Sequence, residues 1–159
     1  MENLTVPKRL MQALRRKAEE SGLTPVETLL DVIIAATDPE ERPVAYIEAA
    51  QELLVQARQE LEAGDERQAS EKIWGAAALA VKAYACAREQ RRITSHSELW
   101  QYKSRIAEEL GDWIHDAWAQ ADAMYTNFYE GWADKQSIQK ALERGEKPTE
   151  AIKQKIKQT

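Results

Sequence analysis

Apolar residues recur at alternating spacings of three and four along most of this chain, which is the pattern of the buried face of an α-helix. The clearest case starts at about Pro43 and carries these inward positions: Ile47, Ala50, Leu54, Ala57 and Leu61. No segment longer than three residues alternates apolar and polar positions with the period of a β-strand. The pattern therefore predicts an all-α protein.

Glycine, proline and capping residues mark where the predicted helices begin and end. Pro7 stands at the start of a helix that Gly22 ends. Thr24 and Glu27 form a capping box for the next helix, and Ser95 opens a similar box later in the chain. These positions divide the sequence into successive helices joined by short turns.

The C-terminal tail after Trp132 keeps helical spacing but contains Gly145 and Pro148. Glycine weakens a helix, and proline removes a backbone hydrogen bond and clashes with the preceding turn. We therefore expect one or two shorter helices, interrupted at these two positions.

The predicted helix over residues 66–91 has seven alanines between Ala76 and Ala87. Small side chains on several faces let neighbouring backbones approach closely, so we expect this helix at the centre of the fold. The architecture predicted is an up-and-down bundle of four main helices, residues 37–159, with an N-terminal helical hairpin extension, residues 1–36.

Composition narrows the function classes. The chain has 159 residues and a net charge of −5, which argues against a surface wholly devoted to nucleic acid. It has one cysteine, Cys86, and two histidines, so we expect no disulfide, no metal site and no cofactor. No apolar stretch is long enough to span a bilayer and no signal peptide is visible, so we expect a cytoplasmic protein without a membrane partner.

Three separated segments carry a resemblance to a known family. They are GDERQASEKIWGAAALAVKAYA from Gly64, SHSELW from Ser95 and AMYTNFYEGW from Ala123. Together they resemble the archaeal PaREP family of repeat-associated proteins, which looks like a branch of the HEPN (higher eukaryote and prokaryote nucleotide-binding) domains. This resemblance implies a helical bundle of four to five helices that forms a homodimer, and it implies no particular activity.

HEPN members that cleave RNA carry an arginine followed, four to six residues later, by a histidine. Arg91 and His96 match that spacing, which makes a metal-independent ribonuclease one hypothesis. The same spacing also arises by chance in a chain rich in arginine, and in those ribonucleases the motif belongs to a later helix. The corresponding segment here, residues 123–130, has neither arginine nor histidine. We therefore expect a protein without catalytic activity.

Lys82 stands alone in an alanine-rich run, and an unpaired buried ammonium is costly. Helical spacing places it on one face with Glu71 and with Gly75, which would leave a notch there. One interpretation is a lysine that reaches water or forms a structural ion pair. The other is a lysine that binds phosphate or a nucleotide in a groove.

His96 lies in the first turn of its predicted helix, where backbone N–H groups attract anions, and Arg91 and Arg92 precede it. These residues could bind phosphate, or the arginines could simply complement the dipole of the helix that they follow. Asn127 and Glu130 flank aromatic residues and could border a recognition surface or face solvent.

Residues 1–36 suggest an alternative function. A short extended stretch, a helix, a turn and a second helix resemble the ribbon-helix-helix fold of dimeric DNA-binding proteins. The alternative is a hairpin that only packs on the bundle or on a second copy.

Our leading hypothesis is a non-catalytic homodimer that binds a nucleotide or RNA. Its candidate ligand-binding residues are Lys82, Arg91, Arg92, His96, Asn127 and Glu130.

Overall fold

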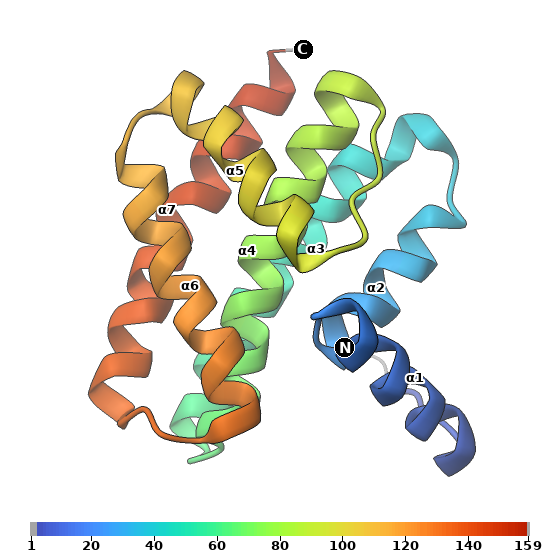
Figure 1. Cartoon of the computed structure of the whole chain (residues 1–159), viewed down its shortest axis with the longest axis vertical. Helices are drawn as coiled ribbons and strands as arrows, with labels where there is room; N and C mark the ends of the chain where they lie inside the picture. The colour runs from blue at the N-terminus through green and yellow to red at the C-terminus, as the bar shows by residue number, and fades with distance from the viewer. Residues whose placement is uncertain (1–2, 159) are drawn as a thin grey trace.

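The computed structural model describes residues 3–158 and is built from helices, without a β-strand in that range (Figure 1). The elements are α1 Lys8–Ser21, α2 Pro25–Ala35, the 3-10 helix η1 Pro39–Glu41, α3 Arg42–Glu62, α4 Glu66–Glu89, α5 His96–Leu110, α6 Trp113–Glu130 and α7 Lys135–Lys157. The prediction of an all-α protein is therefore confirmed. Among the described residues, no helix is both long and apolar enough to cross a membrane.

The alanine-rich helix α4 lies at the centre of the fold, as predicted. It contacts α2, α3, α5, α6 and α7, and Figure 1 shows it between α6 and α7 on one side and α3 behind it. Its alanines from Ala78 to Ala85 are buried, as are Ile73 and Leu79. Close packing around small side chains makes this helix the axis of the bundle.

Local capping contacts start the helices where the sequence predicts them. The Thr24 hydroxyl accepts a hydrogen bond from the backbone N–H of Glu27, and the Ser95 hydroxyl accepts one from that of Glu98. Gly22 ends α1 with a left-handed backbone at φ 70°, a conformation that favours glycine. These contacts are between near neighbours in sequence, which is why the pattern predicts them.

The expectation of an interrupted C-terminal tail is wrong, because α7 is one continuous helix that contains Pro148. Its buried positions continue through the expected break, from Ile138 and Leu142 to Thr149 and Ile152. The Thr149 hydroxyl donates to the backbone carbonyl of Gly145, four residues earlier. Packing of this face on α3 and α4 outweighs the local preference to break.

The first two helices lie at one side of the bundle. In Figure 1, α1 points away from the body, and Ala18 is its one fully buried residue. Helix α2 packs against α1, α3 and α4 and thus connects the hairpin to the bundle. The division of the chain at residue 37 stays a prediction.

Candidate functional site

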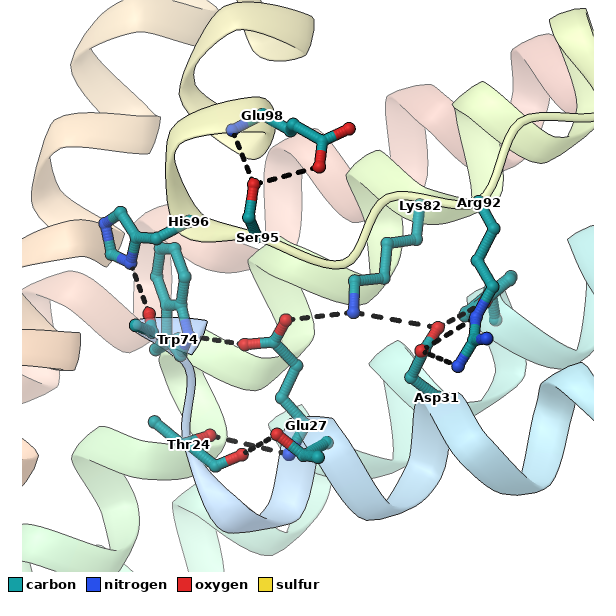
Figure 2. Close-up of polar contacts among 12 residues, drawn as sticks. Thr24, Glu27, Asp31, Trp74, Lys82, Arg92, Ser95, His96 and Glu98 are labelled. Carbon is teal, nitrogen blue, oxygen red and sulfur yellow. Dashed lines mark hydrogen bonds and ion pairs between the residues drawn. The ribbon is translucent and has the colours of Figure 1, made fainter. Parts of the chain in front are cut away.

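Charged side chains are buried where α2 packs on α4. Glu27 and Asp31 lie one turn apart on α2, and Lys82 reaches them from α4. The Lys82 Nζ lies 3.0 Å from Glu27 Oε2 and 3.6 Å from Asp31 Oδ1 (Figure 2). Glu27 is 0% exposed, Lys82 1% and Asp31 4%. Charges buried this deeply are stable only in partnership, so each depends on the others.

Asp31 extends the set of charges toward the surface. Its Oδ2 accepts hydrogen bonds from Arg92 Nε at 3.1 Å and from an Arg92 terminal nitrogen at 2.7 Å (Figure 2). Its Oδ1 accepts a hydrogen bond from the Tyr46 hydroxyl of α3. Burial, together with this hydrogen bond, raises the pKa of Tyr46. The neighbouring carboxylate also raises the pKa of Arg92, so the guanidinium stays charged.

Glu27 extends the same set in the other direction. The indole Nε1 of the buried Trp74 donates to Glu27 Oε1 at 2.8 Å. The ring of His96 stacks on Trp74, with centroids 4.9 Å apart and an angle of 11° between the rings. Figure 2 shows the resulting row of side chains, from His96 through Trp74, Glu27, Lys82 and Asp31 to Arg92.

His96 is held through both ring nitrogens. Nδ1 lies 2.7 Å from the backbone carbonyl oxygen of Gly22, and Nε2 lies 2.6 Å from a carboxylate oxygen of Asp122. Both partners are acceptors, so both nitrogens donate when the ring is a cation. Burial lowers the pKa of His96, but the bonds to Asp122 and Gly22 together outweigh burial and raise the pKa above its ordinary value. The His96 ring therefore fastens the α1–α2 turn to α6.

A groove of about 570 Å³ opens beside these charges, between α1, α2 and the loop before α5. We call it the α1–α2 groove. Its polar lining residues are Lys17, Ser21, Thr28, Asp31, Arg92 and Thr94. Its apolar lining residues are Leu23, Val32, Ala35 and Ala36. The groove thus combines two cations, one carboxylate and several hydroxyls with an apolar wall.

The structure connects three of the six candidate site residues, Lys82, Arg92 and His96, through the side chains of α2 and Trp74. Of the six, Arg92 lines the α1–α2 groove, while Lys82 lies buried behind Asp31. His96 is engaged with Gly22 and Asp122, on the Trp74 side of the set.

The other three candidates lie outside this set. Arg91 forms an ion pair with Glu98 at 3.2 Å. Asn127 is 1% exposed; its Nδ2 donates to Ser70 Oγ at 2.8 Å, and its Oδ1 accepts from the backbone N–H of Ala133 at 2.7 Å. Asn127 therefore ties the turn between α6 and α7 to α4. Glu130, at the end of α6, is exposed.

The expected notch at Gly75 is filled by the core. A β-carbon added there would lie 2.9 Å from Leu53 Cδ1 of α3, so Gly75 serves the close packing of α3 on α4. Glu71 accepts a hydrogen bond from the backbone N–H of Val26 at 3.0 Å and is not the partner of Lys82.

Sequence reasoning missed Glu27 and Asp31 as the partners of Lys82. A signal was present: α2 is otherwise uncharged, and its two carboxylates are four residues apart on one helical face. Lys82 is likewise the one charged residue in its alanine-rich run. Isolated opposite charges in two apolar helices are the pattern expected of a buried ion pair.

Comparison with known proteins gives one match. The model of the archaeal PaREP1/PaREP8 family matches residues 45–147, from early α3 to α7. The match includes Lys82, Arg92 and His96 but not α1 and α2, which supply Glu27, Asp31 and Lys17. Neither the curated proteins nor the solved structures contain a match.

Proposed function

We propose that this chain, which belongs to the archaeal PaREP1/PaREP8 family, is a non-catalytic binding protein. In this proposal it is a homodimeric HEPN-like bundle, and its α1–α2 groove holds a nucleotide or the phosphate of RNA. The observation that carries the proposal is the combination of cations, hydroxyls and an apolar wall in one groove of about 570 Å³. Pockets of this size bind small molecules, with a few polar groups that fix the orientation of the ligand.

The charge balance around the groove favours an anion. Lys17, Lys82 and Arg92 carry three positive charges, against the two negative charges of Glu27 and Asp31. Because Lys82 pairs with both carboxylates from behind, Asp31 repels an incoming anion less. The chain as a whole has a net charge of −5, so a positive local balance marks this groove.

The lining of the α1–α2 groove changes from polar to apolar along α2. Thr28 and Asp31 lie toward the N-terminal end of the lining stretch, and Ala35 and Ala36 lie at its C-terminal end. From Thr28 to Ala36 the helix rises by about 12 Å. A phosphate at the polar end and a base or sugar against the apolar end would fit that length. Charge-assisted hydrogen bonds from Lys17 and Arg92 would supply the strongest contacts.

Titration calorimetry tests the proposal with three ligands: inorganic phosphate, purine and pyrimidine mononucleotides, and a short single-stranded RNA. We expect Lys17→Ala to weaken binding about tenfold, which is 1.4 kcal/mol. The matched control is Lys8→Ala, because Lys8 is exposed on the same helix and nine residues away, on the opposite side. Binding that is absent at millimolar ligand, or equally weakened by both substitutions, would contradict the proposal.

The two alternative functions have less support from contacts. A ribonuclease would use Arg91 and His96, but Arg91 pairs with Glu98 and both His96 nitrogens are engaged. A ribbon-helix-helix protein would read DNA with residues 4–6, which are not part of a strand here. Both alternatives stay predictions.

A further inference from the structure

Lys103 is a buried lysine without a carboxylate partner. It lies on α5 and is 6% exposed. Its Nζ lies 2.8 Å from Nδ1 of His115, in the first turn of α6, and 4.7 Å from the centroid of the Trp100 ring. Among the described residues, Lys103 forms no ion pair. The deeply buried Lys82, by contrast, has two carboxylates. Lys103 therefore lies in a different environment.

Two bases at this distance share one proton. The Lys103 ammonium can donate to Nδ1 of His115 only if the imidazole is neutral, and an imidazolium can donate to Lys103 only if the amine is neutral. At most one of the two side chains is therefore charged while the hydrogen bond is formed. Burial lowers the pKa of Lys103, and no neighbouring carboxylate opposes this effect. A neutral lysine amine is a nucleophile, and an adjacent base activates it further.

Lys103 also lines a small cavity between α4, α5, α6 and α7. The cavity has a volume of about 20 Å³, and its lining residues are apolar apart from Lys103 and the indole of Trp118. The Trp118 Nε1 is buried, and it has no hydrogen-bond partner in the described part of the chain. A space of this size holds about one water-sized group. A carbonyl oxygen is of that size, and it is the kind of acceptor that the Trp118 N–H lacks.

We propose that Lys103 is a covalent binding site for small aldehydes, with His115 as the acid and base that moves the protons. The amine attacks the carbonyl carbon and forms a C–N bond, while the imidazolium gives its proton to the carbonyl oxygen. The ring then takes one proton from the nitrogen and returns it to the hydroxyl, which leaves as water. As the C=N bond forms, the second nitrogen proton passes to the ring. An amine and an aldehyde thus give an imine and one water, without an oxidant or a reductant.

The proposed site lies near the surface. His115 is exposed and Trp100 is 36% exposed, so Nζ of Lys103 lies beneath side chains whose rotation would open a path to it. Lys103, His115 and Trp118 do not line the α1–α2 groove. The inference therefore does not rest on the function proposed above, and either can fail without the other.

Reductive methylation of the intact chain tests the site. Formaldehyde below one equivalent supplies the aldehyde, sodium cyanoborohydride traps the imine, and peptide mapping by mass spectrometry gives the labelling rate of each lysine near neutral pH. We expect Lys103 to be labelled at least about tenfold faster than Lys140, although the Lys140 side chain is 62% exposed. Lys82, which is buried against its carboxylates, should stay unlabelled.

His115→Gln separates the role of the base from that of burial. Glutamine keeps an acceptor for Nζ but cannot move a proton near neutral pH, so the labelling of Lys103 should fall about tenfold while that of Lys140 stays the same. Circular dichroism checks that the variant keeps its helices.

The pH dependence of labelling is a second measurement on the wild-type chain. Because burial lowers the pKa of Lys103, its labelling rate should level off at a lower pH than that of an ordinary lysine, whose pKa is about 10.4. Labelling of Lys103 that is as slow as that of Lys140, or as fast in His115→Gln as in the wild type, would overturn the inference.

Discussion

Helix α4 meets its neighbours in two different ways. Its contacts with α3, α6 and α7 are mainly between buried apolar side chains, with one buried hydrogen bond from Asn127 of α6 to Ser70. Toward α2 it contributes Trp74 and Lys82, which bind Glu27 and Asp31 by specific polar contacts. Apolar packing is non-directional and tolerates adjustment, whereas a buried polar set requires each partner in place. The comparison teaches that the α2–α4 contact depends on buried charges, whereas the other contacts of α4 depend mainly on apolar packing.

The largest effect that this comparison predicts comes from Lys82→Met. The substitution keeps most of the side-chain volume but leaves the Glu27 carboxylate buried without a cation and leaves Asp31 with Arg92 alone. Removing one partner of a buried ion pair costs about 3–5 kcal/mol. Urea unfolding followed by circular dichroism measures the free energy of unfolding.

The control for this prediction is Lys140→Met. The Lys140 side chain is 62% exposed and pairs loosely with Glu143 at 3.8 Å, so we expect a change below about 1 kcal/mol. If Lys82→Met were as mild as Lys140→Met, the α2–α4 contact would not depend on the buried charges. Amide exchange should also show that Lys82→Met loosens α2 before α3 and α6.

A double-mutant cycle sharpens the comparison with a smaller expected effect. Glu27→Gln keeps an acceptor for the Trp74 N–H but removes the charge that faces Lys82. Combined with Lys82→Met, it should be less destabilising than the sum of the two single changes, by about 1–3 kcal/mol. Denaturant unfolding of all four proteins gives this coupling energy. Strict additivity would mean that Glu27 and Lys82 do not stabilise each other.

The same comparison explains what the sequence could predict. Helix starts at Thr24 and Ser95 depend on residues three positions away, and both predictions are confirmed. The central position of α4 follows from its alanine content, and it is confirmed as well. The predicted break at Pro148 failed because contacts with α3 and α4, remote in sequence, stabilise the helix across it.

The candidate site was harder to predict than the fold. The isolation of Lys82 in an apolar run indicated that it needs a partner, but nothing local identified Glu27, which lies on another helix. The capping position of His96 suggested an anion site, whereas its ring turns to Asp122 of α6. Both contacts depend on how distant helices pack, and this information is not in the spacing of nearby residues.

The smallest predicted effect concerns pH. The bonds to Asp122 and Gly22 raise the pKa of His96 despite its burial, so the folded chain binds this proton more tightly than the unfolded chain. The stabilisation that comes from the tighter binding of this proton is fully present below the pKa of His96 in the unfolded chain, about 6.5. It is lost as pH rises through the higher pKa of His96 in the folded chain. We expect the free energy of unfolding to fall across that window, by less than in the substitutions above.

Proton NMR measures this titration directly, because the chain has only two histidines and His115→Gln assigns the resonances. Asp122→Asn removes the carboxylate that faces Nε2, so it should lower the midpoint of His96 and flatten the fall in stability. An unchanged midpoint in Asp122→Asn would show that this carboxylate does not hold the charged ring. Since His96 fastens the α1–α2 turn to α6, the amide protection factors in α1 and α2, which correct for the intrinsic effect of pH on exchange, should fall at high pH while those in the interior of α4 stay high.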